Sequence, residues 1–359
     1  MEVVFYKLFS RMKIPTYFDI LFSSILLDYL LEVVNLKRLG NLYENICDIN
    51  NIVLSYNEVC RNTHNKRRVE NLKEYKSVYI SRIHNILENK NYTVGPYNMF
   101  TIYEPKERKI VSQNVQDKII NHLVARFILY PAILPCLLDV NVASRKNMGT
   151  SKGLELASNF HRICKIKYNS YYILKCDISK FFASIDHDIL KQKLLKRIKD
   201  KDALKIIFDI IDSNLQGLYI CSMTSQILAI FYLNDLDHFI KETLKIKYYV
   251  RYQDDFLLFH KDKNYLKNCL AQIQQFLAKE KLTLNAKTRI YKNTNNFLFL
   301  GRNVHGKYSR YRSVKRKLKS KFYLYKNGKI SLNSFTSSLI CYKNLCNKNF
   351  TFLPKKDST

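Results

Sequence analysis

Hydrophobic and polar residues follow two periods along this chain, and each period predicts one kind of element. Apolar residues spaced three or four positions apart predict helices, whereas short runs of β-branched and aromatic residues predict strands. The predicted helices cover residues 41–92, 115–138, 152–165, 186–199, 227–239 and 263–281. The predicted strands of one sheet are 171–177, 248–251 and 256–260, closed by short strands within 282–291 and 297–301. This mixture predicts an α+β fold.

Two adjacent aspartates stand at the turn of the predicted hairpin 248–260. Apolar and aromatic residues lead up to Asp254 and Asp255 and resume directly after them. Neighbouring carboxylates repel one another, and partial burial adds a desolvation penalty. A divalent metal ion offsets both effects, and Mg²⁺ prefers hard carboxylate oxygens. The turn is therefore a candidate metal site, with an exposed acidic turn as the alternative.

A third aspartate, Asp177, ends another apolar strand and is soon followed by two aromatic residues. Packing alone does not explain a carboxylate that emerges from a buried strand. Adjacent strands of one sheet would bring Asp177 close to Asp254, which lies 77 residues further along the chain. Such a cluster suits a two-metal site for phosphoryl transfer.

Three further segments offer groups for phosphate or for a template. Apolar segments on both sides of the charged turn 104–108 predict a hairpin with a basic tip, which is suited to gripping a triphosphate. The loop 144–150 is basic and contains a glycine. The loop 217–226 is rich in hydroxyl groups and leads into a helix. An ordinary helix capped by Thr224 or Ser225 is the alternative for this last loop.

The charge of the chain favours a polyanionic partner. Lysine and arginine number 60 against 30 acidic residues, which gives a net charge of +30. Nucleic acid is the first candidate and an anionic membrane the second, although an AT-rich genome would also enrich lysine. The basic run within 310–321 would form a phosphate-facing stripe on a helix, with solvated surface as the alternative.

Cysteines and the N-terminal segment bear on the compartment. The nine cysteines contain no CxxC pair, and we expect reduced, mostly buried thiols in a cytoplasmic protein. The apolar run 17–34 is interrupted by three acidic residues, so it falls short of a membrane span. We expect no membrane partner, and we expect residues 1–40 to form a helical extension.

Taken in order, these segments resemble a known family. The chain resembles reverse transcriptases of the bacterial, group-II-intron-related type over residues 41–325. Tyr252-Gln-Asp-Asp255 is similar to the Y-x-D-D box of that family, and Asp177 to its first catalytic aspartate. The resemblance implies an RNA-directed DNA polymerase with a right-hand fold. Its parts would be an N-terminal extension (1–40), fingers (41–170), a palm with an antiparallel sheet (171–303) and a short, basic, helical thumb (304–359).

The resemblance also implies roles for individual residues. The catalytic residues would be Asp177, Asp254, Asp255 and Lys287, of which the lysine protonates the leaving pyrophosphate. The ligands of Mg²⁺, or of Mn²⁺, would be Asp177, Ile178, Asp254 and Asp255. The incoming dNTP would contact Arg108, Lys109, Arg145, Phe182 and Gln226, with the ring of Phe182 excluding a 2′-hydroxyl. The template and primer would contact Gly217, Tyr252 and Gly301.

Within the family, the run 91–105 and the loop ending Thr224-Ser-Gln226 resemble reverse transcriptases of diversity-generating retroelements, in which the glutamine accompanies error-prone copying. Prophage-borne and antiphage-defence reverse transcriptases share this layout and are the competing interpretation, with synthesis templated by a non-coding RNA or primed by protein. Tyr219, Cys221 and Asn147 depart from the usual motifs but leave the metal ligands intact. An inactive RNA-binding scaffold is the alternative outside the enzymes.

The partners implied by the resemblance are an RNA template, a DNA product, a structured non-coding RNA and an accessory protein that supports the short thumb. We expect neither an endonuclease module nor a maturase domain, since no sequence follows residue 359. A mobile group II intron protein is therefore not the expected class.

Overall fold

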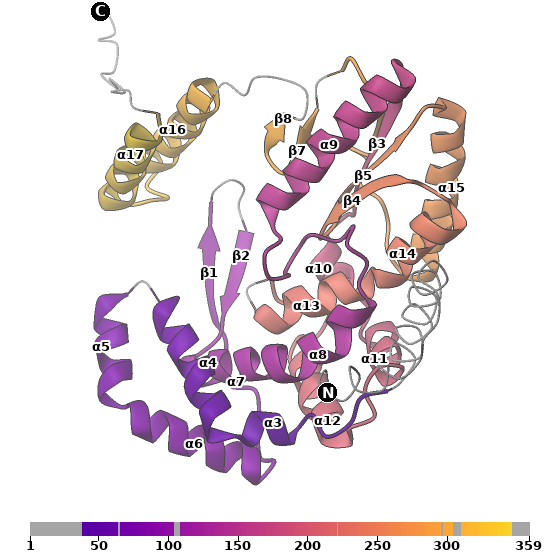
Figure 1. The fold of residues 1–359 in the computed structure, drawn as a ribbon. Coiled ribbons are helices and arrows are strands. Elements are labelled where there is room, and N and C mark those ends of the chain that lie inside the picture. The colour runs from indigo at the N-terminus through magenta and orange to yellow at the C-terminus, as the bar shows by residue number, and fades with distance from the viewer. Residues whose placement is uncertain are drawn as a thin grey trace, which may run out of the picture.

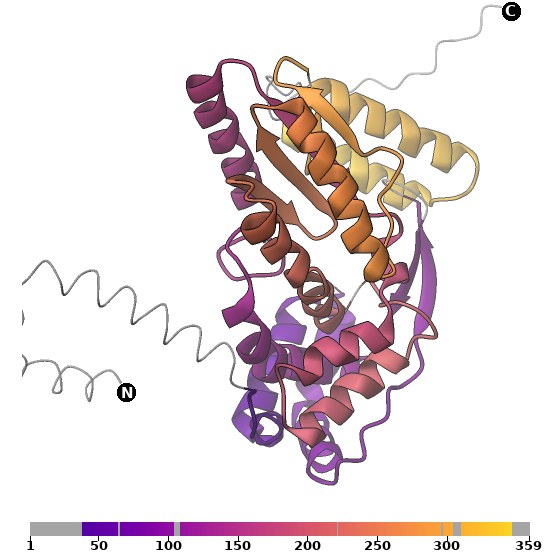
Figure 2. The ribbon, with the colours of Figure 1, turned by 90° about the vertical axis from the view of Figure 1, so that its right-hand side faces the viewer.

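The structure is a computed structural model that describes residues 38–63, 65–103, 108–220, 222–295, 297–303 and 310–346. The predicted helical extension lies outside these residues as far as position 37. Figure 1 shows a helical region at the bottom, a sheet covered by helices at the upper right, and a pair of helices at the upper left. Figure 2 shows the same regions from the side. The predicted boundaries at 40, 170 and 303 stay predictions.

The region before the sheet is mostly helical, as its apolar spacing predicts. A two-stranded antiparallel hairpin of β1 (Asn98–Ile102) and β2 (Arg108–Ser112) stands within it, where the charged turn predicted one. Its helices are α3 (Glu44–Cys47), α4 (Ile49–Arg61), α5 (Lys66–Glu74), α6 (Lys76–Glu88), α7 (Val115–Leu123), the π-helix η1 (Val124–Leu129), α8 (Tyr130–Ile133), the 3-10 helix η2 (Leu134–Cys136) and α9 (Thr150–Tyr168).

The central sheet has four strands in the order β4-β5-β3-β6, and every pair is antiparallel. The strands are β3 (Tyr172–Asp177), β4 (Tyr248–Tyr252), β5 (Asp255–His260) and β6 (Arg289–Lys292). The helices that accompany it are α10 (Phe181–Ser184), α11 (His187–Leu195), α12 (Lys201–Asp212), α13 (Met223–Tyr232), α14 (Asn234–His238), the π-helix η3 (Phe239–Thr243) and α15 (Lys263–Lys279). The antiparallel sheet confirms the predicted α+β class.

Alternation along the strands divides the side chains of the sheet between two cores. Ile173, Val250 and Leu257 face one side, where they pack with Ala157 and Cys164 of α9. The intervening residues face the other side, where they pack with the buried residues of α15 and α13. Because successive side chains of a strand point to opposite faces, the two helices α9 and α15 cover opposite faces of one sheet (Figure 2).

Aspartate and asparagine residues begin several of these helices. The side chains of Asp48, Asn114, Asp186, Asp200 and Asp262 accept hydrogen bonds from backbone N–H groups in the first turns of α4, α7, α11, α12 and α15. Each bond satisfies a donor that has no partner inside the helix, and each typically contributes about 1 kcal/mol. The polar residues between apolar runs thus fix where the helices start.

Some predicted element boundaries were wrong. Residues 297–301 do not join the central sheet, because the chain leaves β6 through a turn and buries Phe297 and Phe299 against the α9 side. There β7 (Leu298–Phe299) and β8 (Arg302–Asn303) form a separate hairpin. Within 282–291, only the part from residue 289 is a strand of the sheet. The predicted helix 186–199 is shorter, since α11 ends at Leu195.

The apolar helix predicted over 227–239 starts earlier and is interrupted. Its N-cap residue is Ser222 rather than Thr224 or Ser225, and α13 ends before Leu233. The hydroxyl groups of Ser222 and Thr224 donate to the side-chain oxygen of Asn121 on α7 instead of capping the helix. A contact to a residue about 100 positions away therefore replaces the local cap.

The stretch Val115–Cys136 is long and apolar enough to cross a membrane by length and composition, with a mean hydropathy of 1.5. However, 56% of its most apolar window is buried inside the protein, and a mostly buried core helix passes the same test of length and composition. The six cysteines whose side chains the structure describes are free thiols, as predicted. Of these, Cys164, Cys176 and Cys269 are buried, and the other three are partly exposed, so the prediction that the cysteines are mostly buried holds for half of them.

The last described helices are α16 (Arg310–Lys326) and α17 (Leu332–Cys346), which pack against one another. Phe322 and Tyr325 contact Phe335 across this pair. The ammonium group of Lys329 lies 5.4 Å from the centre of the Tyr103 ring, next to β1. The basic run is helical, as the phosphate-stripe interpretation requires.

Candidate active site

The ends of two neighbouring strands bring the predicted aspartates together. Asp177 at the end of β3 is paired directly with Asp255 at the start of β5. Asp254 occupies the turn before β5, and its backbone carbonyl accepts a hydrogen bond of 3.3 Å from the N–H of Ile178. The four residues predicted as metal ligands therefore lie at one edge of the central sheet.

Lys175 provides the positive charge at this edge. It precedes Asp177 by two positions, so both side chains leave the same face of β3. Its ammonium group lies 3.3 Å from Oδ2 of Asp255 and donates to the carbonyl of Leu298 over 2.6 Å. Lys175 therefore links the β7–β8 hairpin to a predicted metal ligand. Sequence reasoning missed it, although the two-residue spacing from Asp177 was available as a signal.

Asp255 is mostly withdrawn from solvent, with 21% of its side chain exposed. Desolvation raises the pKa of its carboxyl group from the usual 3.8 to about 6; Lys175 opposes the rise, while Asp177 and Asp254 add to it. Its Oδ1 atom is buried and accepts no hydrogen bond from the residues that the structure describes. A buried carboxylate oxygen without a donor is unfavourable, and an incoming cation would relieve that state.

The carboxylates are near one another but do not form a closed metal cage. Among the described residues, no group of three or more histidine, cysteine or acidic side chains is arranged to hold a metal ion. The donors at the edge of the sheet are hard carboxylate oxygens, which are the ligands that Mg²⁺ prefers. Mg²⁺ usually keeps several waters and binds through one or two carboxylates together with substrate phosphates. The orphaned Oδ1 of Asp255 fits such an open site.

A buried ion pair supports the turn that carries the predicted catalytic residue Asp254. The guanidinium of Arg251 on β4 and the carboxylate of Asp237 on α14 are both fully buried and bond to one another through two pairs of atoms. Tyr249 donates to the same carboxylate over 2.6 Å, and Arg251 donates to the backbone carbonyl of Gln253 over 3.1 Å. This brace was not predicted, although an arginine inside an apolar strand is a signal that a buried partner is needed.

The start of the loop 217–226 lies against Phe182, the residue predicted to exclude a 2′-hydroxyl. The N–H of Leu218 donates to the carbonyl of Phe182 over 2.7 Å, and the carbonyl of Gly217 lies 2.7 Å from Nε2 of His187. Phe182 is partly buried and its ring meets that of Phe181 edge-on, with centroids 5.6 Å apart. The loop 217–218 therefore sets the backbone position of the residue predicted to select the sugar.

We expect Gly217→Ala to destabilise the protein more than Gly301→Ala. Both glycines have a positive φ, of 69° and 74°, so both substitutions introduce backbone strain of about 1 kcal/mol. At Gly217 the new Cβ would also clash with backbone, namely with the carbonyl oxygen of Phe182, whereas at Gly301 no atom of the described residues lies within 4 Å. Denaturant unfolding should give a loss of roughly 2 kcal/mol or more for Gly217→Ala. Equal losses would show that the loop does not press on Phe182.

Two of the predicted nucleotide contacts are engaged with the protein itself. Arg145 donates to the carbonyls of Leu138 and Asn141, over 3.0 and 3.2 Å, and pairs with Asp139 at 3.1 Å, so it braces the loop before α9. Gln226 is exposed on α13, and its Oε1 lies 3.4 Å from the hydroxyl of Ser144. Their contact with a dNTP stays a prediction.

The remaining predicted residues surround this edge on different elements. Lys287 is exposed in a loop that follows Asn285, and the N–H of Asn285 donates to the carbonyl of Asp177 over 2.7 Å. Tyr252 pairs directly with Asp255, and Gly301 lies in the β7–β8 hairpin that Lys175 tethers. Arg108 and Lys109 begin β2; their side chains lie outside the described residues.

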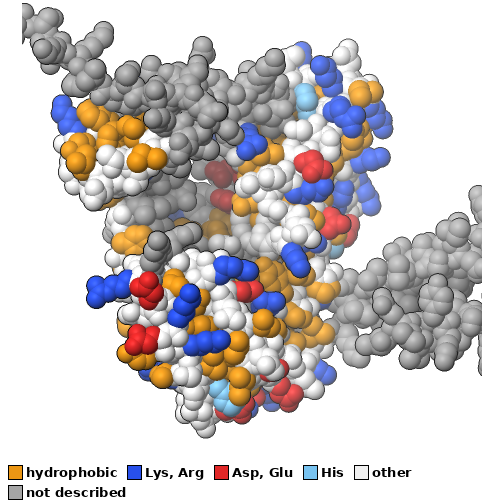
Figure 3. Space-filling view, turned by 60° about the vertical axis from the view of Figure 1, so that its left-hand side comes forward, with side chains coloured by type: hydrophobic (Ala, Val, Ile, Leu, Met, Phe, Trp, Pro, Cys, Tyr) orange, Lys and Arg blue, Asp and Glu red, His pale blue; other side chains and the backbone are white. Residues whose placement is uncertain are grey.

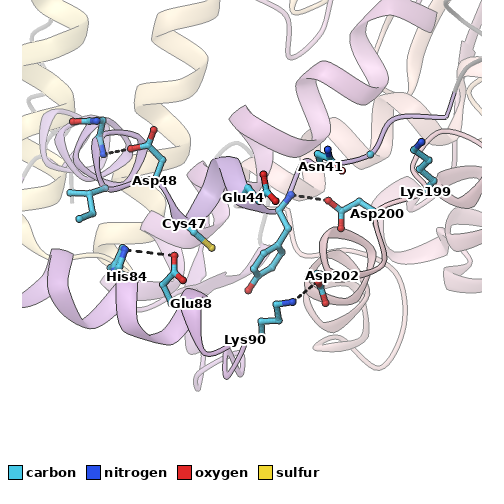
Figure 4. A pocket seen from close by; sticks show the side chains of 14 residues that line it. Asn41, Glu44, Cys47, Asp48, His84, Glu88, Lys90, Lys199, Asp200 and Asp202 are labelled. Atoms are coloured by element: carbon cyan, nitrogen blue, oxygen red, sulfur yellow. Dashed lines mark hydrogen bonds and ion pairs between the residues drawn. The ribbon is translucent and has the colours of Figure 1, made fainter.

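A separate cavity of about 860 Å³ lies between α3, α4, α6 and the start of α12 (Figure 4). Two of its acidic side chains already have partners. Asp200 accepts from the N–H groups of Leu42 and Tyr43, and Asp202 pairs with Lys90 at 2.6 Å. The predicted site residues with described side chains do not line this cavity. Figure 3 shows one face of the molecule, and lysine and arginine gather at its upper right, where few acidic side chains are visible.

The chain belongs to the reverse transcriptase family. The family model for reverse transcriptase (RNA-dependent DNA polymerase) matches residues 97–304, which include every described element from β1 to β8. This membership confirms the predicted reverse transcriptase family, and the antiparallel central sheet agrees with the predicted α+β fold class.

Comparison with individual proteins gives weaker similarities. A COX1/OXI3 intron 1 protein of Saccharomyces cerevisiae is 21% identical over 177 residues, which cover 48% of this chain and 20% of that protein. The chain thus spans about a fifth of the length of this curated relative. Among solved structures, apo telomerase from Candida tropicalis gives a TM-score of 0.47 at 14% identity, over 61% of this chain and 56% of that one. Telomerase from Candida albicans in complex with a telomeric RNA fragment gives the same values over 76% and 57%.

Proposed function

We propose that this protein is an RNA-directed DNA polymerase that extends a primer with dNTPs on an RNA template. The observation that carries the proposal is the direct pairing of Asp177 with Asp255, beside Asp254, at one edge of the antiparallel sheet. Nucleotidyl transfer needs little covalent chemistry from the protein and depends on positioning and on charge stabilisation. A scaffold that only binds RNA would have no use for a desolvated carboxylate whose Oδ1 has no partner within the described part of the chain.

Divalent metal ions are the cofactors that this proposal requires. Asp177, Asp254 and Asp255, with the backbone of Ile178, would hold Mg²⁺ or Mn²⁺. When bound, these ions would activate the primer hydroxyl and neutralise the triphosphate. The protein itself would keep the carboxylates in place through the β3–β5 pairing and through the brace behind the turn. Lys287 would supply a proton to the leaving pyrophosphate, and Arg108, Lys109 and Arg145 would bind the triphosphate.

The finer biological role rests on the sequence. The Thr224-Ser-Gln226 ending of the loop 217–226 supports a diversity-generating retroelement, in which copying is error-prone. A cytoplasmic complex with a structured non-coding RNA and an accessory protein would fit the net charge of +30. An antiphage-defence reverse transcriptase is the second candidate, supported by the same motifs.

The proposal is tested by purifying the protein and supplying an RNA template, a DNA primer, dNTPs and Mg²⁺. Sequencing the product tells copying from template-free addition, and its error rate bears on the retroelement role. DNA joined covalently to a tyrosine would favour protein priming and the defence role. A protein that binds RNA but adds no nucleotide, even with RNA copurified from its host, would contradict the polymerase and support the scaffold.

We expect Phe182→Ala to accept ribonucleotides. The wild-type ring would exclude a 2′-hydroxyl, so the smaller side chain should lower the preference for dNTP over NTP by roughly 10- to 100-fold, the range typical of a single steric contact. Single-nucleotide incorporation with dNTP and NTP in parallel measures this ratio. Phe181→Ala is the matched control, because Phe181 is buried in the core beside it. An unchanged ratio in Phe182→Ala would remove the sugar-gate role.

A further inference from the structure

A serine joins the predicted nucleotide contact Gln226 to the catalytic turn. The hydroxyl of Ser144, in the loop before α9, lies 3.4 Å from Oε1 of Gln226 and 3.0 Å from Nε2 of Gln253. Gln253 directly precedes Asp254. Figure 1 shows the segment between α8 and α9 passing over α13 towards β4. Within this segment, Asn141 forms an isolated parallel β-bridge with Arg251. Three segments far apart in the sequence thus meet at one hydroxyl group.

The chemistry of these three groups fixes the direction of both hydrogen bonds. The amide nitrogen of Gln253 can only donate, so the Ser144 oxygen accepts there. A hydroxyl has a single proton, and that proton is left for Oε1 of Gln226, which can only accept. The carbonyl side of the Gln226 amide is therefore directed to Ser144. Its NH₂ group, which donates two hydrogen bonds, is left on the opposite side of an exposed side chain.

Ser144 and Gln253 are both held in place by other contacts. The backbone carbonyl of Ser144 accepts from the hydroxyl of Tyr130 over 3.0 Å, and Ser144 has a φ of 52°. Gln253 has a φ of 54°, and its carbonyl accepts from the buried Arg251. The side-chain oxygen of Gln253 is buried and has no hydrogen-bond partner among the described residues. The amide nitrogen bonded to Ser144 therefore anchors this side chain.

We propose that Ser144 is a positioning residue that orients the amide of Gln226 so that an N–H donor faces the nucleotide site. This inference rests on the proposed polymerase function and deepens it. A donor at this point selects an acceptor atom, an oxygen or ring nitrogen of the incoming nucleotide or of its template partner. A reversed amide would offer a carbonyl acceptor and would favour other atoms. Ser144 also makes the orientation depend on the turn that carries Asp254.

The test measures kcat and KM for one correct and one incorrect dNTP in single-nucleotide incorporation. We expect Ser144→Ala to change the ratio of kcat/KM for correct over incorrect dNTP by about three- to tenfold, mainly through KM, since the neutral hydrogen bond that orients Gln226 is lost together with the one from Gln253. Ser144→Gly removes the same hydroxyl but relieves the positive φ. The two variants should therefore differ in stability and agree in selectivity.

Gln253→Glu is the sharper variant, because it keeps the shape of the side chain but turns a donor into an acceptor. Ser144 would then donate to the new carboxylate and accept from the NH₂ of Gln226, which reverses the amide. We expect selectivity to change at least as much as in Ser144→Ala although the hydroxyl is retained. In a Gln226→Ala background, Ser144→Ala should have no further effect on selectivity.

The outcomes separate this inference from the polymerase function. Template-directed synthesis with selectivity unchanged in Ser144→Ala, or changed as much in the Gln226→Ala background, would overturn the positioning role and leave the polymerase standing. A wild-type protein that adds no dNTP would overturn both. Binding of dNTP to primer–template complexes with Ca²⁺ in place of Mg²⁺, followed without turnover, should weaken in Ser144→Ala and Gln253→Glu to the same extent as KM rises.

Discussion

We expect Asp255→Asn to lose nucleotide incorporation by at least about a thousandfold and, in the absence of metal, to unfold at a higher denaturant concentration than the wild type. The loss of activity follows because a neutral amide cannot neutralise a divalent ion as a carboxylate does. The gain in stability follows because the wild-type carboxylate is desolvated at an edge shared with Asp177 and Asp254, with Lys175 as its counterion. Asparagine has nearly the same shape and removes that charge.

The raised pKa of Asp255 fixes how its contribution to the free energy of unfolding changes with pH. The pKa of Asp255 is raised from 3.8 to about 6 on folding, so the folded protein binds this proton more tightly than the unfolded chain. Its contribution to stability is complete below pH 3.8 and is lost as the pH rises through about 6. The shift of about 2.2 pH units, at about 1.4 kcal/mol each, sets an upper bound of about 3 kcal/mol.

Chemical unfolding of both proteins in EDTA from pH 4 to pH 8 measures this contribution. The Asp255→Asn variant should match the wild type near pH 4 and exceed it by about 1 to 3 kcal/mol above pH 7. Mg²⁺ should then stabilise the wild type but not the variant, since only the wild type offers the ionised ligand. A variant that is less stable than the wild type at pH 7.5 would contradict the strained, desolvated state of this carboxylate.

The largest loss of stability is expected for Arg251→Met. The substitution leaves the carboxylate of Asp237 fully buried without its cation, and breaking a buried ion pair in this way costs about 3 to 5 kcal/mol. It also removes donors from the carbonyls of Ile230 and Gln253, so the turn before Asp255 loses its support. We expect incorporation to fall more than the folded fraction does. Denaturant unfolding and the rate per folded molecule measure the two effects separately.

Two variants control this experiment. Tyr249→Phe removes one hydrogen bond to Asp237 and leaves the ion pair, so a loss of about 1.5 to 3 kcal/mol is expected. The double variant Arg251→Met with Asp237→Leu removes both charges and should recover part of the stability, because an apolar pair of similar volume replaces a desolvated one. If the double variant recovers no stability, the burial of an uncompensated charge is not the cause of the loss in Arg251→Met.

The sequence predicted well where a signal is local. The apolar and aromatic runs on both sides of Gln253 and Asp254 placed the hairpin turn correctly, because such runs favour strands and the polar residues between them favour a turn. The same reasoning placed Asp177 at the end of its strand. The prediction that adjacent strands bring Asp177 close to Asp254 followed from chemistry, because a two-metal site needs clustered carboxylates. The register, with Asp177 opposite Asp255, came only from the structure.

Features that depend on distant partners were not predicted. Residues 297–301 look like any short strand, and only the packing of Phe299 on the α9 side removes them from the central sheet. Arg251 finds Asp237 on another element, and Ser144 meets Gln226 and Gln253 across 82 and 109 positions. A single sequence does not show which distant residues meet. The ion pair of Arg251 with Asp237 and the hydrogen bonds of Ser144 could therefore be found only in the structure.

The most direct test of the active-site assignment is the rate of primer extension on an RNA template with Mg²⁺, measured for the wild type beside Asp254→Ala. We predict template-directed extension by the wild type and a rate lower by at least about a thousandfold in the variant, at equal folded fraction. Extension by Asp254→Ala at a rate near that of the wild type would show that the carboxylates at this edge of the sheet do not carry the reaction.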